Sequence, residues 1–291
     1  MRIDNYESLK EIKTLGEQSI RKFNTVFLVE DELEQKFVQK RCLLSNESGC
    51  QLLLEEFKFS FDDIQLPSVV KLDRTEAELI LTLDYKFGVP LDIHWKNLRR
   101  KERKVFLSQF IPQFLELIQS VHKKGIVHND IRPGNIIIDG ESIHLIDFGM
   151  ATRIGEETKR KFLFSLQYAS PELILNQMHV LNPTSDLFSF ALVLIQLLNG
   201  KPILSHSNPS VLTNLAITYP IDLKGIVPKE FRSLLEQMCI KATFLTAPNR
   251  MDPKEVVRLL KDAQKRRVNP QLIVEWNTAC KSYSEKRKWF G

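Results

Sequence analysis

The sequence predicts an α+β fold in two parts, in which a small β-rich part with one helix precedes a larger helical part. Within residues 8–85, short runs of alternating, β-branched and aromatic residues favour strands. From residue 105 onward, apolar residues recur at helical spacing. The character changes near residue 86, where we expect a hinge and, between the two parts, a ligand cleft.

Four strands and one helix are expected in the first part. The first two strands are β-branched and aromatic runs that an acidic turn separates. The run GCQLLLEEFKFSFDD is interpreted as the helix. The strands are expected at 25–31, 36–42, 68–72 and 78–85, and the helix at 49–63.

A long helix opens the second part. Its apolar residues at 106, 110, 114, 117, 118 and 121 predict a helix over 105–125, which ends in Lys-Lys-Gly, a common helix stop. Two short apolar strands follow, joined by a tight turn. The strands are expected at 135–139 and 143–147, and further helices at 171–178, 186–199, 229–239 and 253–266.

Composition indicates a globular chain with a sizeable core. Of the 291 residues, 43% are hydrophobic and 26% are charged, as in ordinary globular domains. The net charge of +5 comes from dispersed basic residues with local clusters, such as 97–104. We interpret these clusters as solvated faces and helix ends, because no aromatic residues interleave with them as in a nucleic-acid footprint. No nucleic-acid partner is expected.

Other global signals favour a cytoplasmic monomer without a membrane segment. The four cysteines show no CxxC spacing and no His partners at metal-ligand spacing, which indicates reduced structural thiols. The charged N-terminus lacks the apolar core of a secretory signal. The most apolar window, 186–200, is too short to span a bilayer and is expected to be a buried helix.

A polar loop, VHNDIRPGNIII at 127–138, lies between apolar runs. If the two following strands form a hairpin, Asn135 and Asp147 come near each other. A carboxylate and an amide oxygen are hard ligands that suit Mg²⁺. Asp130, five residues before Asn135, is then available to accept a proton from a hydroxyl, and Arg132 can neutralise a phosphate.

These residues resemble motifs of the eukaryotic-type protein kinase family. HNDIRPGN is similar to that family's catalytic loop, H-R-D-L-K-P-x-N, and DFG at 147–149 is similar to its metal-binding motif. The resemblance implies that Asp130 is the catalytic base and that Asn135 and Asp147 bind Mg²⁺. Arg132 stands where the family has a Lys that contacts the γ-phosphate.

The rest of the chain distinguishes this family from aminoglycoside and sugar kinases, which share a similar loop. YASPE at 168–172 resembles the closing motif of the activation segment, and 185–202 resembles the long central helix. Arg250 matches the late Arg that pairs with the Glu of the closing motif, here Glu172. Ser165, three residues before the closing motif, is typical of serine/threonine kinases.

In the first part, KFVQKRC resembles the family's V-A-I-K strand, which implies that Lys40 holds the α- and β-phosphates of ATP. Lys40 then needs a helix Glu. Glu56 fits the family pattern, and Glu55 remains an alternative because the sequence does not determine the helix phase. Both residues lie on the helix expected at 49–63.

The resemblance also implies an adenine site. Val26, Val38 and Ile137 match the positions that sandwich the ring. Leu83 resembles the gatekeeper, and the following DYK, with Asp84 and Tyr85, resembles the hinge whose backbone binds the adenine edge.

Two positions depart from the family pattern. The glycine-rich loop G-x-G-x-x-G is reduced to Gly16, because Ser19, Arg21 and Asn24 fall on the three glycines, where side chains hinder backbone approach to phosphates. Asn129 replaces the Arg that docks an activation-segment phosphate, so control through Thr158 or a neighbouring residue is not expected.

Taken with the resemblance, the sequence predicts a bilobal protein kinase fold with a small antiparallel β-rich N-lobe containing one helix and a larger α-rich C-lobe. The N-lobe is expected at 8–85, the C-lobe at 86–266 and a docked C-terminal helix at 267–291. The expected function is ATP- and Mg²⁺-dependent phosphorylation of Ser or Thr in proteins that the sequence does not name. The alternatives are a pseudokinase that acts as a binding or regulatory module and a small-molecule kinase.

Overall fold

The computed structural model describes residues 9–15, 24–156, 166–174, 183–205, 208 and 211. The chain forms two compact units that alternate along the sequence. The first unit combines the residues up to Val89 with Ile137–Ala151, and the second combines Pro90–Ile136 with the residues from Thr152 onward. The predicted α+β fold, with a β-rich first part and a helical second part, is confirmed.

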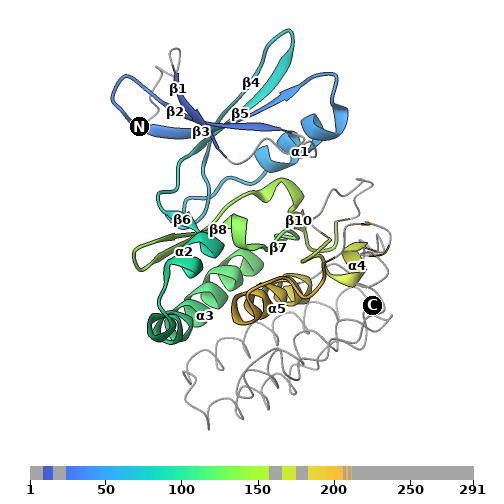
Figure 1. Cartoon of the computed structure of the whole chain (residues 1–291). Helices are drawn as coiled ribbons and strands as arrows, with labels where there is room; N and C mark the ends of the chain where they lie inside the picture. Colours follow the sequence, from blue (N-terminus) through green and yellow to red (C-terminus); the bar gives the residue numbers. More distant parts are fainter. Residues whose placement is uncertain are drawn as a thin grey trace. The chain divides into compact units, whose positions relative to one another are not determined.

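The first unit is built on a five-stranded antiparallel sheet with the order β1-β2-β3-β5-β4 (Figure 1). The four predicted strands are all present, within a few residues of their expected ends. The sequence did not predict β1, which has one apolar residue, Ile12, and is exposed along its length at the sheet edge. The strands are β1 (Lys10–Thr14), β2 (Thr25–Glu30), β3 (Lys36–Leu43), β4 (Val69–Arg74) and β5 (Glu78–Asp84).

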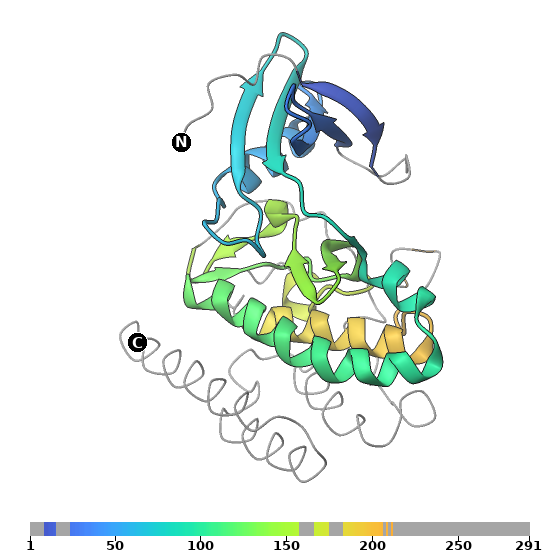
Figure 2. The ribbon, with the colours of Figure 1, turned by 90° about the vertical axis from the view of Figure 1, so that its left-hand side faces the viewer.

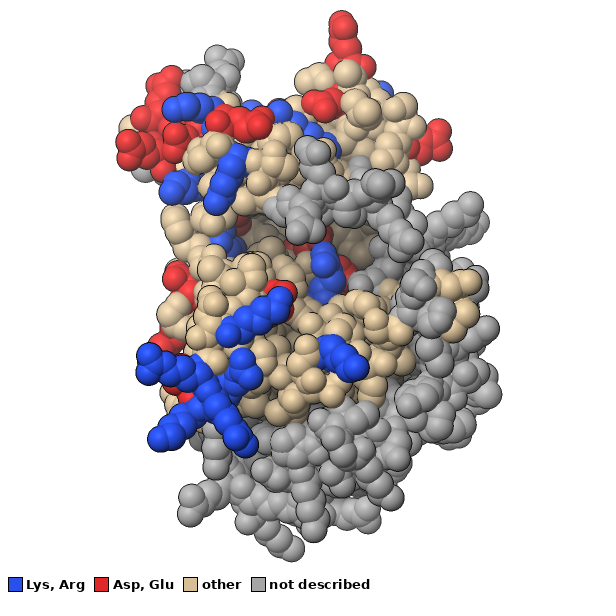
Figure 3. Space-filling model, in the orientation of Figure 1, with Lys and Arg blue, Asp and Glu red and all other residues tan. Residues whose placement is uncertain are grey.

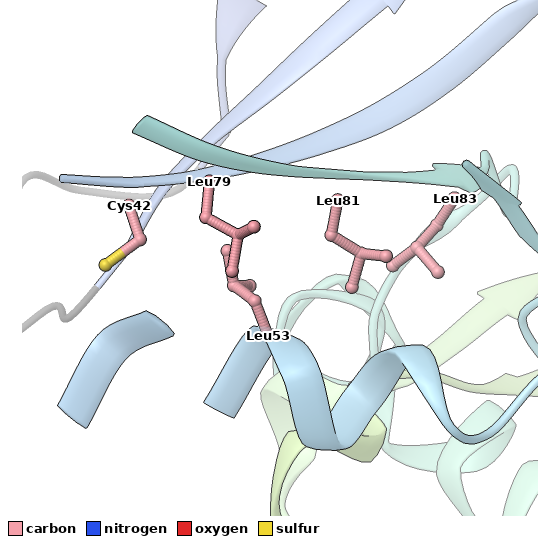
Figure 4. Close-up of a cluster of buried hydrophobic side chains, with 5 residues drawn as sticks. All are labelled: Cys42, Leu53, Leu79, Leu81 and Leu83. Atoms are coloured by element: carbon pink, nitrogen blue, oxygen red, sulfur yellow. The ribbon is translucent and has the colours of Figure 1, made fainter. Parts of the chain in front are cut away.

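Helix α1 (Glu47–Phe57) packs on one face of this sheet. It begins where the side chain of Asn46 accepts a hydrogen bond from the amide of Gly49, which satisfies one of the unpaired N–H groups of the first turn. Figure 4 shows Leu53 of α1 facing a row of sheet residues, and these side chains form a buried apolar cluster. The sheet residues are Cys42, Leu79, Leu81 and Leu83.

The helix predicted over 49–63 is wrong beyond Phe57. Phe59 and Phe61 leave the helix and pack against Phe148, with ring centroids 6.3 and 4.7 Å apart. Burial of three aromatic rings outweighs the continuation of the helix, because a large apolar side chain gains about 1.5–3 kcal/mol on full burial. The segment Phe59–Phe61 therefore belongs to the core of the unit rather than to α1.

The predicted hairpin completes the first unit. It consists of β8 (Ile136–Asp139) and β9 (Ser142–Leu145), and a short 3₁₀ helix, η2 (Phe148–Met150), follows it. Gly88 lies against this hairpin with φ of +115°. A Cβ at Gly88 would lie 2.3 Å from the carbonyl oxygen of Ile138, so no other residue fits there. The chain passes from the first unit to the second within β6 (Val89–Pro90).

The second unit is mainly helical in its described residues. Figure 2 shows α3 and α5 side by side, and Phe110 and Phe114 of α3 contact Phe190 of α5. Helix α5 is the predicted buried helix, which is confirmed. The elements are α2 (Leu91–Asn97), α3 (Arg100–Lys123), β7 (Ile126–Val127), η1 (Pro133–Asn135), β10 (Thr152–Arg153), α4 (Pro171–Ile174) and α5 (Pro183–Asn199).

Two differences from the sequence prediction fall at the start of this unit. Helix α2 was not predicted, because only Leu91 and Trp95 of its seven residues are buried and so short a run carries little periodicity. Helix α3 begins at Arg100 rather than near 105. The start of this helix is basic, since Arg99, Arg100 and Lys101 are exposed there. Figure 3 shows Lys and Arg side chains gathered on this part of the surface.

Some predicted elements lie outside the described residues: the helices at 229–239 and 253–266, the end of the helix at 171–178, and the C-terminal segment 267–291. The domain limits at 8–85 and 86–266 stay predictions. Among the helices that the structure describes, none has the length and apolar character needed to cross a membrane.

Candidate active site

A buried ion cluster lies where β3, α1 and the segment after β9 meet in the first unit. The ammonium group of Lys40 donates to both carboxylate oxygens of Glu56, at 2.7 and 2.6 Å, and to Oδ1 of Asp147 at 2.8 Å. The side chains of Lys40 and Glu56 are 11% and 2% exposed, whereas that of Asp147 is 36% exposed. Lys40 is therefore held by two carboxylates, one of which remains accessible to solvent.

The two carboxylates keep Lys40 charged. Burial alone lowers the pKa of the Lys40 ammonium, but the opposite charges of Asp147 and Glu56 outweigh burial and raise the pKa above its ordinary value. The backbone amide of Phe148 also donates to Glu56. The cluster thus presents a permanently charged, oriented cation, which is what a phosphate site requires.

The structure pairs Lys40 with Glu56 and not with Glu55. Gln51 donates to Glu55 at 2.6 Å and Lys58 donates to it at 2.8 Å, so Glu55 is engaged within its own helix. Glu56 lies three residues after Leu53, on the face of α1 that packs on the sheet.

Replacement of Glu56 with Gln should reduce phosphotransfer turnover about 100-fold, because Lys40 loses the charged partner that orients it. The matched control is Glu55→Gln, one residue away on the same helix and similarly buried. It should leave turnover close to that of the wild type. Steady-state kinetics with ATP and a peptide acceptor measure both. Equal losses in the two variants would mean that the Lys40–Glu56 contact has no special role.

The residues predicted to contact adenine occupy one face of the sheet or lie in the hairpin. Val26 is the cross-strand partner of Lys40, and Val38 that of Leu83, so these side chains share the face that carries Lys40. Val26 and Val38 are half-buried and Ile137 is buried. Their nucleotide contacts stay predictions.

The other predicted cofactor positions have different surroundings. The Asp84 carboxylate accepts from the amide of Ser68 at 2.7 Å and pairs with Lys86 at 2.8 Å, which anchors the end of β5. The ring of Tyr85 meets that of Phe87 edge-on, at 4.9 Å between centroids. Gly16 lies outside the described residues, as do most of the loop positions predicted to replace the family's glycines.

Three predicted catalytic-loop residues lie together in the second unit. Oδ2 of Asp130 accepts from Nε of Arg132 at 3.0 Å and from Nδ2 of Asn135 at 2.8 Å. Nδ2 of Asn135 also donates to the backbone oxygen of Asp130, at 2.9 Å. These bonds orient the Asn135 amide through its nitrogen, so its carbonyl oxygen is the atom suited to a cation.

Asp186, in the first turn of α5, anchors the backbone of the predicted catalytic loop. Its carboxylate accepts from the backbone amides of His128 and Asn129, each at 2.8 Å, and contacts Nε2 of His122 at 2.8 Å. Asp186 is fully buried. Burial raises its pKa, but the hydrogen bond and charge of His122 and the His128 contacts outweigh burial, so the pKa of Asp186 lies below its ordinary value.

The sequence interpretation missed this anchor. His128, whose amide donates to Asp186, is itself fully buried. The one available signal was an Asp at the start of an otherwise apolar helix.

Asn129 stands where the family has an Arg that docks a phosphate, and its side chain makes an uncharged contact instead. It is buried, with φ of +65°, and its Nδ2 donates to Oγ1 of Thr152 at 3.0 Å. Thr152 belongs to β10, which pairs with β7. The catalytic loop is thus linked to the strand after the DFG motif by an uncharged hydrogen bond. Thr158 lies outside the described residues.

The DFG motif is shaped by its backbone and by aromatic packing. Asp147 has φ of +70°, and Phe148 is fully buried against the rings of Phe59 and Phe61. The left-handed conformation at Asp147 is uncommon for a residue with a side chain and is typical of functional sites.

The residues predicted to hold Mg²⁺ supply suitable atoms. Asp147 offers a partly exposed carboxylate and Asn135 an oriented amide oxygen. Within the described part of the chain, no group of three or more His, Cys, Asp or Glu residues could hold a metal by itself. Mg²⁺ usually takes one or two protein oxygens and completes its shell with water and phosphate. The pairing of Asn135 with Asp147 stays a prediction.

The closing motif is described only in part. Tyr168 is buried and its hydroxyl donates to Gln196 of α5. Burial raises the pKa of Tyr168 to about 12, so the hydroxyl stays protonated and able to donate. Ser165, the Glu172 side chain and Arg250 lie outside the described residues.

Comparison with known proteins identifies one family. Residues 10–263 match the family model described as "Protein kinase domain". Human cGMP-dependent protein kinase 2 is 29% identical over 240 residues, which cover 78% of this chain and 29% of the human protein. The Drosophila melanogaster cGMP-dependent protein kinase, isozyme 1, is 30% identical over 236 residues, with 75% and 28% covered.

A second group of relatives is also similar. Mitogen-activated protein kinase 12 of Danio rerio is 29% identical over 188 residues, which cover 64% of this chain and 48% of the fish protein. The chain thus spans less than a third of the length of the cGMP-dependent kinases and about half of this one.

Proposed function

Because the chain belongs to the protein kinase domain family, we propose that it transfers the γ-phosphoryl group of ATP to Ser or Thr hydroxyls of protein substrates. The observation that carries the proposal is the buried cluster in which Glu56 and Asp147 hold the charged Lys40. A buried ion cluster adds little to the stability of a fold, because apolar side chains of similar volume are often as stable. Its presence therefore points to a role in binding a ligand.

Each group has a role in phosphoryl transfer, whose transition state is stabilised mainly by positioning and by charge neutralisation. Lys40 binds the α- and β-phosphates and Arg132 takes up charge on the γ-phosphate. Asp130 orients the acceptor hydroxyl and accepts its proton. Asn135 and Asp147 would hold Mg²⁺, which would supply further neutralisation of the phosphates.

The hydrogen bond of Arg132 to Asp130 supports this division of roles. It fixes one carboxylate oxygen of Asp130, and Asn135 donates to that same oxygen. With two donors on Oδ2, the Asp130 carboxylate is held in one orientation, which a general base needs.

The main competing function is a pseudokinase that binds a nucleotide or a partner without transfer. It is favoured by the sequence of the glycine-rich loop, in which Ser19, Arg21 and Asn24 replace the glycines. Close approach of the backbone to phosphates is hindered at such positions. The catalytic groups Lys40 and Asp130 argue against it, because a binding module has no need of a proton acceptor.

The test is an autophosphorylation and peptide-library assay of the full chain with Mg²⁺ and ATP, read by mass spectrometry. Phosphate on Ser or Thr of peptides or of the chain supports the proposal. A thermal shift with Mg²⁺-ATP but no transfer would replace it with the pseudokinase. Transfer to sugars or aminoglycosides and not to peptides would replace it with a small-molecule kinase.

A further inference from the structure

Two thiols meet where β3 ends and α1 begins. Cys42 is the second-last residue of β3, and Cys50 lies in the first turn of α1. Sγ of Cys42 and Sγ of Cys50 both donate to the carbonyl oxygen of Leu43, at 3.5 and 3.4 Å. Cys50 also packs against the apolar cluster that includes Cys42. Two sulfur atoms that share one acceptor need little movement to join.

The segment between Cys42 and Cys50 is short and is fixed by a helix cap. Seven residues separate Cys42 from Cys50, and Asn46 within this stretch caps α1. Figure 4 shows the sulfur of Cys42 turned from the sheet toward the side on which α1 lies. A disulfide requires Cα atoms about 4.4–6.8 Å apart and sulfurs that face each other, and a turn of this length between packed elements permits that.

We infer that Cys42 and Cys50 form a reversible oxidation site, in which a disulfide ties the end of β3 to the start of α1. The linked elements are those that carry Lys40 and Glu56. Because the two thiols share the Leu43 carbonyl in the arrangement in which Lys40 and Glu56 are paired, the disulfide holds α1 in that paired position. The bond itself does not depend on the proposed kinase activity.

The two thiols have different accessibility, which sets the order of the chemistry. Cys42 is buried, and burial together with its contact to Cys50 raises the pKa of the Cys42 thiol to about 12. Cys50 is partly exposed. A peroxide therefore reaches Cys50 first, since oxidation requires an accessible thiolate.

The reaction with hydrogen peroxide balances in two steps. The Cys50 sulfur attacks one peroxide oxygen, the O–O bond breaks, and water leaves with the thiol proton, which gives a sulfenic acid on Cys50. The Cys42 sulfur then attacks the Cys50 sulfur, the S–O bond breaks, and the departing hydroxide takes the Cys42 proton as a second water. Two thiols and one peroxide thus give one disulfide and two waters, and a reducing dithiol reverses the change.

The experiment treats the full chain with increasing hydrogen peroxide, blocks remaining thiols with N-ethylmaleimide, and maps peptides by mass spectrometry without reduction. The expected result is a cross-linked pair of peptides that contain Cys42 and Cys50 and that separate on reduction. Oxidation should also raise Tm by about 5 °C, as expected for a short loop, and should slow hydrogen exchange in α1. Both readouts are independent of kinase activity.

Two variants control this test. Cys50→Ser replaces the partly exposed thiol and should abolish the cross-link and the Tm increase. Cys42→Ala, at the buried position, should leave Cys50 to accumulate as a sulfenic acid that a dimedone probe captures. Oxidation of Cys50 without the cross-link in the wild type, or pairing of either thiol with Cys239 or Cys280, would overturn the inference.

Discussion

Replacement of Asp130 with Asn should lower the turnover of phosphotransfer about 10²- to 10⁴-fold, the usual contribution of a general base. The amide keeps the volume of the side chain, so the contact from Arg132 can persist. It cannot accept the proton of the acceptor hydroxyl. Nucleotide binding should be retained, because the charge that binds phosphate resides on Lys40 and not on Asp130.

Single-turnover kinetics separate the chemical step from nucleotide binding, which a Mg²⁺-ATP thermal shift measures independently. The matched control is Glu116→Gln, which removes an exposed carboxylate from α3 and should leave both quantities unchanged. Wild-type turnover in Asp130→Asn would remove Asp130 from the catalytic role.

Replacement of Asp186 with Ala should destabilise the chain by about 3–5 kcal/mol, the usual cost of breaking a buried charged contact. The carboxylate accepts from two backbone amides and contacts His122. Its loss leaves two buried N–H groups without their acceptor, and each such group costs about 1–3 kcal/mol. Tm should fall by about 10 °C, and turnover should fall as well because the catalytic loop loses its anchor.

Calorimetry and urea unfolding measure this effect. The control is Asp92→Asn in α2, whose carboxylate has only a 3.9 Å contact with Lys96 and should change stability by less than about 0.5 kcal/mol. Equal stability of wild type and Asp186→Ala would show that the backbone holds the loop without this residue.

The Asp186 carboxylate also makes the stability of the folded chain depend on pH in the acid range. The pKa of Asp186 is lower in the folded chain than its ordinary value of 3.8. A depressed carboxyl pKa stabilises the folded state above the unfolded value, and this stabilisation is lost as pH falls through the folded value. Below about pH 4, the difference in stability between wild type and Asp186→Asn should therefore shrink.

Local patterns were enough to predict most of the sheet. The strands at 36–42 and 78–85 appear as β3 and β5 because alternation of side chains follows directly from backbone geometry. The exposed edge strand β1 was missed because its sequence, KEIKT, has no apolar face. It is a strand because β2 offers it hydrogen bonds, which a local pattern does not show.

The end of α1 shows the same limit in another form. The sequence favours a helix through residue 63, but the helix ends at Phe57. The chain leaves the helix there because the rings of Phe59 and Phe61 pack against Phe148, which lies far along the chain. Local helix propensity is overridden when packing against a distant residue buries more apolar surface.

By itself the sequence predicted the family, the order of its motifs and the residues proposed for the chemistry, including Lys40, Asp130 and Asp147. These properties depend only on residue type and spacing, both of which the amino-acid sequence contains in full. Only the tertiary structure decided that Glu56 rather than Glu55 meets Lys40, that Asp186 binds the backbone of the catalytic loop, and that Cys42 and Cys50 share the carbonyl of Leu43. Each of these depends on helix phase and on contacts between separate elements, whose energies arise only when the chain is packed.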